Sequence, residues 1–317
     1  SVVVTLLNPI LGILEDSSGT PASSSLTVPN KNNVQMNVRS NTLSGILPIK
    51  VETTFKDANN QDKNLTKVFN IVILSGPPTA MSFSYASTAQ DAPHAKFIEN
   101  WVLTVTDKYN NRVNTTPAVA MGMITGYTES SSAIAPANYL YYDSASNDGN
   151  LTNAAIDTFS SSISAFGNVD LVNDKLVLFG GTGYRFDTYG KWDINAIDSN
   201  NQLSLKDDYN GTNVSGLGYA VGHNFRNETC SGNPVVANVY AQDGNNTLDS
   251  TGSMIIQVEY DYYLVGKSTV LWANLVGESN NTQAKVGLGR KITLRGQELF
   301  SEIYDIPAGL WVLQDYL

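Results

Sequence analysis

The chain is poor in the residues that most often carry chemistry. Its 317 residues include a single cysteine, Cys230, and two histidines, His94 and His223. One cysteine excludes an intrachain disulfide and a metal site built from several thiolates. His223, Glu228 and Cys230 are near one another in the sequence, but their spacing fits no zinc motif. We therefore expect neither a zinc centre nor histidine catalysis.

Motifs of the common enzyme classes are missing as well. No Gly-x-Ser-x-Gly elbow occurs, and the glycine-rich stretch Phe179 to Gly183 is not followed by the Lys-Ser/Thr of a phosphate-binding loop. Paired carboxylates can hydrolyse sugars, but among 29 acidic residues some pair could always be found, so their number indicates nothing. We expect no enzymatic activity.

Positive charge and long apolar runs are also scarce. The chain has 19 Lys and Arg against 29 Asp and Glu, a net charge of −10. Nucleic acids and anionic membranes bind proteins with a basic footprint, so neither is an expected partner. The stretch from Val2 to Leu14 is apolar, but it contains Pro9 and is shorter than the roughly 20 residues that cross a bilayer. We expect no membrane insertion.

What the sequence does contain is alternation of apolar and polar residues with a period of two. This pattern occurs at residues 34–39, 49–55, 69–73, 81–85 and 254–264. It predicts strands with one face on a core and the other in water. Helical spacing is confined to a short stretch, 153–166, where Ile156 and Phe159 would suit a brief helix. The predicted fold class is all-β.

Breaks between the strands predict the domain organisation. Gly76-Pro77-Pro78 ends one strand before the next begins, so residues 1–75 are predicted to form a first β-sandwich domain. Residues 76–265 are predicted to form a second, larger domain. The long polar stretch around 126–174 is too long for an ordinary loop and is interpreted as an insertion. Residues 266–317 either complete the second domain or begin another.

Residues 74–114 resemble bacterial Ig-like repeat domains of the invasin/intimin type (Big domains). The resemblance rests on the Gly-Pro junction after Leu74 and on the segment Trp101 to Asn114. In that segment the family pattern L-x-V-T-D-x-x-G-N-x-V is occupied by Leu103, Val105, Thr106, Asp107, Asn111 and Val113. Asn110 replaces the usual glycine, and asparagine also accepts the left-handed conformation. The resemblance implies tandem immunoglobulin-like β-sandwich domains, in which the turn from Asp107 to Asn111 is structural.

The resemblance also implies a function. Such proteins are secreted or attached to the bacterial cell surface, where they act as stalks and adhesins. The main hypothesis is therefore a non-enzymatic extracellular structural or adhesive protein. Its expected partners are other copies of itself, flanking Ig-like domains, or a host or glycan ligand.

Two further hypotheses stay open. An apolar N-terminal strand could insert into a neighbouring subunit and build a filament or surface layer; the candidate assembly residues are Val2, Val4, Leu6, Ile10 and Leu14. The same segment could instead be the first strand of its own domain. Alternatively, the insertion could shape a carbohydrate-binding or carbohydrate-active site, since 16 tyrosines and four tryptophans could form sugar platforms as well as core.

Three loops rich in Asp and Asn are weak candidates for structural calcium. Each gathers several oxygen ligands in a short span, and the acidic candidates are Asp57 and Asp62, Asp143 and Asp148, and Asp243 and Asp249. None of the loops follows the EF-hand pattern. Because Asp and Asn also close turns without any metal, plain turns are the alternative interpretation. No other cofactor is expected.

Overall fold

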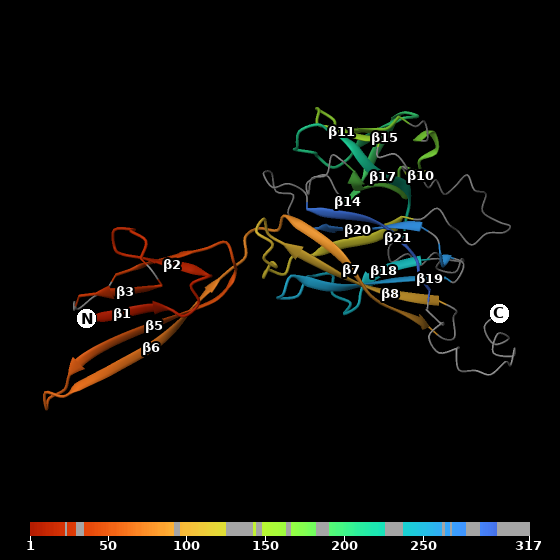
Figure 1. Ribbon diagram of the computed structural model, residues 1–317. Helices are drawn as coiled ribbons and strands as arrows, with labels where there is room; N and C mark the ends of the chain where they lie inside the picture. Colours follow the sequence, from red (N-terminus) through yellow and green to blue (C-terminus); the bar gives the residue numbers. More distant parts are fainter. Residues whose placement is uncertain are drawn as a thin grey trace, which may run out of the picture. The chain divides into compact units, whose positions relative to one another are not determined.

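The protein is built almost wholly from β-strands in antiparallel sheets, as the computed structural model shows (Figure 1). The structure describes residues 1–22, 24–29, 35–91, 96–124, 142–143, 148–162, 166–181, 190–225, 237–261, 264–266, 268–276 and 286–296. This confirms the predicted all-β class. His94 and Cys230 lie outside the described residues.

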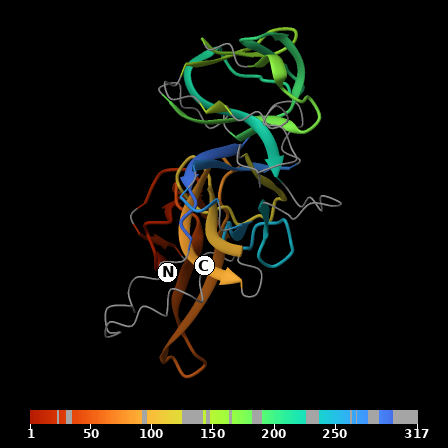
Figure 2. The same ribbon diagram turned by 90° about the vertical axis from the view of Figure 1, so that its right-hand side faces the viewer.

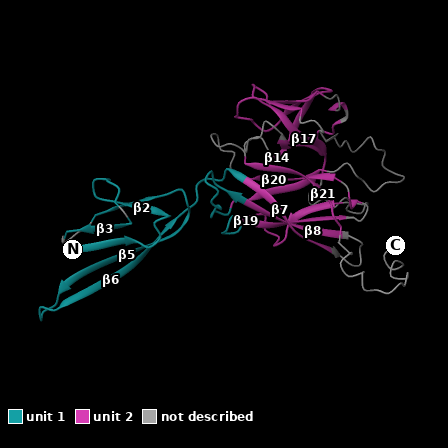
Figure 3. Ribbon diagram, viewed as in Figure 1, with its two compact units in different colours: residues 1–80, 105–116, 249–252 teal, residues 81–104, 117–248, 253–317 magenta. Residues whose placement is uncertain are grey.

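The chain divides into two compact units (Figure 3). Unit 1 comprises Ser1–Ala80, Val105–Thr116 and Asp249–Gly252, and unit 2 comprises Met81–Thr104, Pro117–Leu248 and Ser253–Leu317. The first segment of unit 1 ends close to the predicted junction at residue 76. Unit 1 also takes two short segments from the stretch that the sequence assigns to the second domain.

Unit 1 contains a four-stranded sheet in the order β3-β1-β5-β6. Its strands are β1 (Val2–Leu6), β3 (Ser25–Val28), β5 (Gly45–Lys56) and β6 (Asp62–Ile73), and a separate pair consists of β2 (Gly12–Glu15) and β4 (Asn37–Ser40). The buried core cluster comprises Val4, Leu6, Leu11, Leu14, Leu47 and Ile49. These residues come from β1, from β2 and the residue before it, and from the start of β5. The core therefore lies against β1 and the first part of β5.

The first sheet of unit 2 has the order β18-β19-β8-β7. Its strands are β7 (Ala80–Asp91), β8 (Lys96–Thr106), β18 (Ala237–Ala241) and β19 (Ser253–Asp261). Alternate residues of these strands are buried, including Trp101 and Leu103 on β8 and Ile256 and Val258 on β19. One face of this sheet therefore lies on a core, as the period-two pattern predicts.

The second sheet of unit 2 has 11 strands in two parts. One part has the order β9-β20-β21, with β9 (Val119–Ile124), β20 (Ser268–Leu275) and β21 (Gly287–Thr293). The other part comprises β10 (Tyr142–Asp143), β11 (Gly149–Thr152), β12 (Thr158–Ser160), β13 (Asp174–Gly181), β14 (Gly190–Trp192), β15 (Ile194–Ser199), β16 (Gln202–Leu205) and β17 (Val214–Phe225), with a 3-10 turn, η2, at Phe166–Asn168. Strand β17 joins the two parts by pairing with β9. Strands β20 and β21 thus pair within unit 2.

Strands β10 to β17 form a separate layer with its own core. They curve around one another above the blue strands β20 and β21 in Figure 2. Their buried cluster includes Phe159, Phe166, Leu176, Trp192 and Tyr219. This layer begins in the predicted insertion and continues to β17, beyond residue 174.

The short helix considered for residues 153–166 is wrong for the described part of that stretch. Residues 158–160 form β12, and Phe159 is buried in the layer core while Ile156 is exposed. The Asp157 carboxylate accepts hydrogen bonds from the backbone N–H groups of Ala154 and Tyr209. These bonds fix a turn before β12 in place of a first helical turn.

Strand β20 is buried on both faces. On one face Val270 and Trp272 pack with Val177 of β13 and Ala220 of β17, and the alternate residues, such as Leu271, are also buried. A Cβ atom at Gly122 would lie 2.7 Å from the Trp272 ring, so glycine is needed on the neighbouring strand. Continuous burial explains why β20 does not alternate in sequence.

Two polar contacts fix the β10–β17 layer on β20. The Asn274 Oδ1 accepts from the Lys191 N–H at 3.1 Å, and the Asn274 Nδ2 donates to the Lys191 carbonyl at 3.0 Å. The Trp272 Nε1 donates to the Asn224 Oδ1 at 2.7 Å. The layer is therefore attached through specific hydrogen bonds as well as apolar packing.

Candidate functional site

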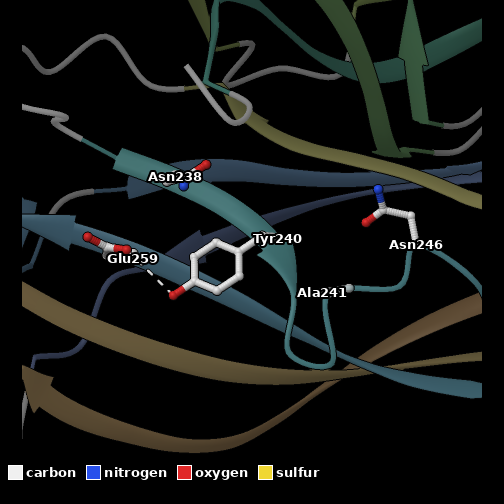
Figure 4. Close-up of a pocket in the computed structure, with 6 residues that line it drawn as sticks. Asn238, Tyr240, Ala241, Asn246 and Glu259 are labelled. Carbon is white, nitrogen blue, oxygen red and sulfur yellow. Dashed lines mark hydrogen bonds between the residues drawn. The ribbon is translucent and has the colours of Figure 1, made fainter. Parts of the chain in front are cut away.

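A polar pocket of about 390 Å³ lies at the edge of the four-stranded sheet of unit 2 (Figure 4). Its described lining residues are Asn238, Tyr240, Ala241, Gly244, Asn246 and Glu259. Strand periodicity places Asn238 and Tyr240 on the same face of β18, and Glu259 of β19 is directly opposite Asn238. The Tyr240 hydroxyl donates to Glu259 Oε2 at 3.5 Å. The loop that follows β18 contributes Gly244 and Asn246.

This pocket offers two carboxamides, a carboxylate and a phenol. Such groups can hydrogen-bond hydroxyl groups, and an aromatic ring can pack on an apolar ligand face. Among the described residues that line the pocket, Glu259 is the single acid. The described lining therefore provides hydrogen-bonding groups and one aromatic ring that suit a ligand bearing hydroxyl groups.

The two calcium candidates of the first loop, Asp57 and Asp62, have other partners in the structure. The Asp57 Oδ1 accepts the N–H groups of Asn59 at 2.8 Å and Gln61 at 2.9 Å, which closes the turn between β5 and β6. The Asp62 carboxylate instead forms an ion pair with Lys56 at 3.3 Å. Asn60 at the turn has a φ angle of 60°, a conformation that asparagine accepts.

In the other two loops, Asp243 and Asp249 close turns, whereas Asp148 bonds a more distant segment. The Asp243 Oδ1 accepts from the Asn245 N–H, and the Asp249 Oδ1 accepts from the N–H and hydroxyl of Thr251. The Asp148 Oδ2 accepts from the hydroxyls of Ser161 and Ser162. The side chain of Asp143 lies outside the described residues.

Hydrogen bonding also governs the charge of Asp148. Burial would raise its pKa, but the bonds from the two serines outweigh burial and lower the pKa below 3.8. Within the described ranges, no three His, Cys, Asp or Glu side chains are grouped closely enough to hold a metal ion. Calcium in these loops remains a prediction.

Most of the candidate assembly residues lie in the interior of unit 1. Val4, Leu6 and Leu14 are buried in its core and Val2 packs against that core, whereas Ile10 is 67% exposed. Strand β1 pairs with β3 on one side and β5 on the other. The apolar N-terminal strand is therefore one of the two inner strands of its own sheet.

A second strand of unit 1, β6, carries many exposed apolar side chains. Every residue of this strand from Asp62 to Val72 is exposed. Its large apolar side chains include Leu65 (60% exposed), Phe69 (52%) and Val72 (62%). The sequence predicts a strand here but not this exposure, because a pattern does not say whether a second layer covers the apolar face. A usable signal is that Val68 and Val72 break the alternation and place apolar groups on the second face too.

Asp107 stabilises the turn that the family resemblance calls structural. Its Oδ1 accepts the N–H groups of Tyr109 and Asn111, and its Oδ2 accepts the Gly76 N–H at 2.8 Å and the Asn111 Nδ2 at 2.9 Å. Burial opposes ionisation, but these bonds outweigh it and lower the pKa of Asp107. Asn110 has a φ angle of 65°, the left-handed conformation expected from the sequence.

A second buried carboxylate, Glu99, lies in unit 2 and was missed by sequence reasoning. It is fully buried and accepts hydrogen bonds from the Trp101 Nε1 at 2.9 Å, the Tyr260 hydroxyl at 2.8 Å and the Arg295 N–H at 2.6 Å. Burial, together with the nearby Glu99 charge, raises the pKa of Tyr260, so its hydroxyl stays a donor. The guanidinium of Arg295 lies 3.8 Å from the centre of the Tyr85 ring. The network joins β8, β19 and the end of the described chain.

Asp174, at the start of β13, is a buried residue whose carboxyl pKa is far above its ordinary value. Burial raises the pKa of Asp174 to about 6, although its Oδ2 accepts the Asp170 N–H at 2.9 Å. Among the described residues its Oδ1 has no hydrogen-bond partner. His223 is its neighbour across the β13–β17 pair and favours the charged form. A raised pKa marks a carboxylate that weakens the fold at neutral pH.

Replacing Asp174 by asparagine is expected to stabilise the protein above pH 6 and not at acid pH. Because the folded pKa is above the unfolded value of 3.8, the stability associated with the neutral form is complete below 3.8 and is lost as the pH rises through about 6. The expected gain at neutral pH is about 2 kcal/mol after allowance for screening. Chemical unfolding at about pH 4 and about pH 8 measures it.

Asp170 provides the matched control for this experiment. The pKa of Asp170 is lowered by hydrogen bonds from the N–H of Val172 and the side chain of Asn173, so Asp170→Asn should not stabilise the protein at alkaline pH. An Asp174→Asn variant whose advantage is the same at both pH values would show that titration of this carboxyl is not the cause.

No protein-family model, curated protein or solved structure matches the chain. The described part of the chain has no helix with the length and apolar character needed to cross a membrane. The resemblance to bacterial Ig-like repeats therefore stays a prediction.

Proposed function

We propose that this chain is a non-enzymatic structural or adhesive protein of a bacterial cell surface, built around an Ig-like sandwich. The observation that carries the proposal is the strand order of unit 2. Constant-type immunoglobulin domains have sheets in the orders A-B-E-D and C-F-G. Taking β7, β8, β9, β18, β19, β20 and β21 as A to G, the orders β18-β19-β8-β7 and β9-β20-β21 are D-E-B-A and C-F-G.

In the chain order, the β10–β17 layer is then an insertion between strands C and D. Such domains carry function on loops and insertions held by a rigid scaffold. The sequence resemblance at residues 74–114 covers β7, β8 and the Asp107 turn, which are the first strands in this assignment. The strand order and the sequence resemblance both favour an extracellular module whose partners are other copies, flanking Ig-like domains, or a host or glycan ligand.

Surface location is tested by shaving intact cells of the source organism with protease. Antibodies against the recombinant chain should label intact cells, and protease treatment should remove the signal while a cytosolic marker survives. Protection of the chain until the cells are lysed would contradict the proposal. Adhesion is then measured as binding of the purified chain to immobilised host matrix proteins.

A second candidate function, carbohydrate binding, is favoured by the pocket shown in Figure 4. A glycan array probed with the purified chain should identify a ligand, and Tyr240→Ala should reduce its binding at least tenfold by removing the ring and hydroxyl. Ser84→Ala, at an exposed position on β7 away from the pocket, is the matched control. Unchanged glycan binding by Tyr240→Ala, or no binding by the unaltered chain, would overturn this candidate.

A further inference from the structure

Strand β6 of unit 1 is a long, unpaired sheet edge with apolar side chains on both faces. It runs over 12 residues and, among the described strands, pairs with β5 on one side only. The other edge of that sheet, β3, has four residues. The edge strand of a sheet has unpaired N–H and C=O groups that can hydrogen-bond to another strand. Proteins normally protect such edges with charge, bulges or covering segments.

Charge protects only the first half of β6. Asp62, Lys63 and Lys67 are the charged residues of the strand, whereas residues 68–74 carry none. Within that uncharged half, Phe69 and Ile71 face the core side of the sheet, since they pair with Ile49 and Leu47 of β5. Val68 and Val72 lie on the opposite side. The uncharged half is the part of the edge able to accept another strand.

We propose that β6 pairs antiparallel with β6 of a second copy of this chain, with a two-fold axis at Asn70. The segment Val68-Phe69-Asn70-Ile71-Val72 is close to a palindrome in residue type. Pairing about Asn70 places Phe69 opposite Ile71, Val68 opposite Val72, and Asn70 opposite itself. Two four-stranded sheets then become one continuous sheet. An isologous contact of this kind closes after two copies.

Other registers are less favourable on the same grounds. Pairing about Lys67 opposes two lysines, and a parallel in-register arrangement opposes every lysine with itself, which costs stability. A shift by one residue places the core side of one sheet beside the solvent side of the other. The register about Asn70 avoids both penalties, because Lys67 then faces Ile73 and Lys63 lies beyond the paired segment.

The available area is sufficient for a specific contact. Leu65, Val68, Phe69, Ile71, Val72 and Leu74 are each between 39% and 67% exposed. Side chains of this size offer on the order of 500 Å² of apolar surface per copy, and two copies offer about 1,000 Å², the lower bound for a specific interface. Main-chain hydrogen bonds along the new strand pair add to this.

This inference differs from strand exchange through the N-terminal segment. Strand β1 lies between β3 and β5, so donating it would dismantle the sheet of unit 1. Strand β6 needs no such rearrangement. The inference concerns unit 1 and goes beyond the proposed function, which rests on unit 2, so either can fail without the other.

Sedimentation equilibrium with matched substitutions on β6 tests the proposal. The unaltered chain should dimerise reversibly, and Asn70→Lys should weaken the dimer roughly tenfold or more, because two like charges would meet at the axis. Asn64→Lys is the control: Asn64 is exposed on the same face, but the two copies of residue 64 would be about 40 Å apart in this register. Its dimer should match that of the unaltered chain. A monomer at all concentrations up to about 100 μM, or equal effects of the two substitutions, would overturn the proposal.

Disulfide cross-linking tests the register itself. With Cys230 replaced by serine, Asn70→Cys should form a covalent dimer under mild oxidation, since residues directly opposite in an antiparallel pair are near the distance that a disulfide spans. Asn64→Cys should stay unlinked. Dimerisation of the unaltered chain without selective cross-linking at residue 70 would assign the contact to another surface and overturn the β6 pairing.

Discussion

Replacing Glu99 by alanine is expected to lower the free energy of unfolding of unit 2 by about 4 kcal/mol. The substitution leaves the Trp101 indole N–H, the Tyr260 hydroxyl and the Arg295 N–H without their buried acceptor, and it opens a cavity. Two of the three donors, Trp101 and Tyr260, belong to side chains that are themselves buried, so water cannot replace the lost acceptor. Denaturant unfolding followed by tryptophan fluorescence measures the loss, since Trp101 is part of the network.

Two further variants show whether the network, and not the loss of any glutamate, is responsible. Glu52, a residue of β5 whose side chain is 41% exposed and pairs with Lys50, should tolerate alanine within about 0.5 kcal/mol. Glu99→Gln keeps the shape but replaces one acceptor oxygen with a donor, so its stability should fall between those of Glu99→Ala and the unaltered chain. A loss below about 1 kcal/mol for Glu99→Ala would show that the network contributes little.

Replacing Asp107 by alanine is expected to cost about 3 kcal/mol at neutral pH. Asp107 is 2% exposed, and its carboxylate accepts four hydrogen bonds, one of them from Gly76 at the end of the first strand-rich segment. Because the folded pKa is below the ordinary value of 3.8, this stability is present above 3.8 and is lost as the pH falls through the lowered folded value. The difference between Asp107→Ala and the unaltered chain should therefore shrink in acid.

Asp57 offers a matched control for Asp107. It closes a turn of the same kind with two backbone hydrogen bonds, but its side chain is 24% exposed and it does not bond to a distant segment. Asp57→Ala should cost about 1 kcal/mol. Urea unfolding at neutral and acid pH compares the two variants. Equal losses would mean that burial and the bond to Gly76 contribute nothing beyond the local turn.

The local features of the fold follow from the sequence. Alternation at 49–55, 69–73, 81–85 and along β19 predicts strands that the structure contains, and the Asp107 turn has the left-handed Asn110 that its sequence predicts. Each of these features is decided by residues within a few positions of one another. Period and turn chemistry act at that range, which is why they can be read from one sequence.

Features that depend on distant segments could not be predicted in this way. Glu99 meets Tyr260 and Arg295, which are 161 and 196 positions away. The pocket likewise needs the β18–β19 register, which places Glu259 opposite Asn238. The exposure of the β6 side chains depends on which strands of the sheet the core of unit 1 covers. The misassigned helix near Phe159 has the same origin, because its spacing suited both a helix and a turn before a strand, and contacts with Tyr209 decide between them.

Separation along the chain also determines when unit 2 can form during synthesis. Thr104 of β8 pairs with Ser253 of β19, 149 positions later, and β20 pairs with β9 across the whole β10–β17 layer. Loop closure over such distances is slow, so the sheets of unit 2 cannot assemble until most of the chain has left the ribosome. The β5–β6 hairpin, in contrast, needs only a local turn and can form early. On a growing chain its apolar edge is therefore exposed while unit 2 is still incomplete, and neighbouring nascent chains on one messenger RNA can meet through it.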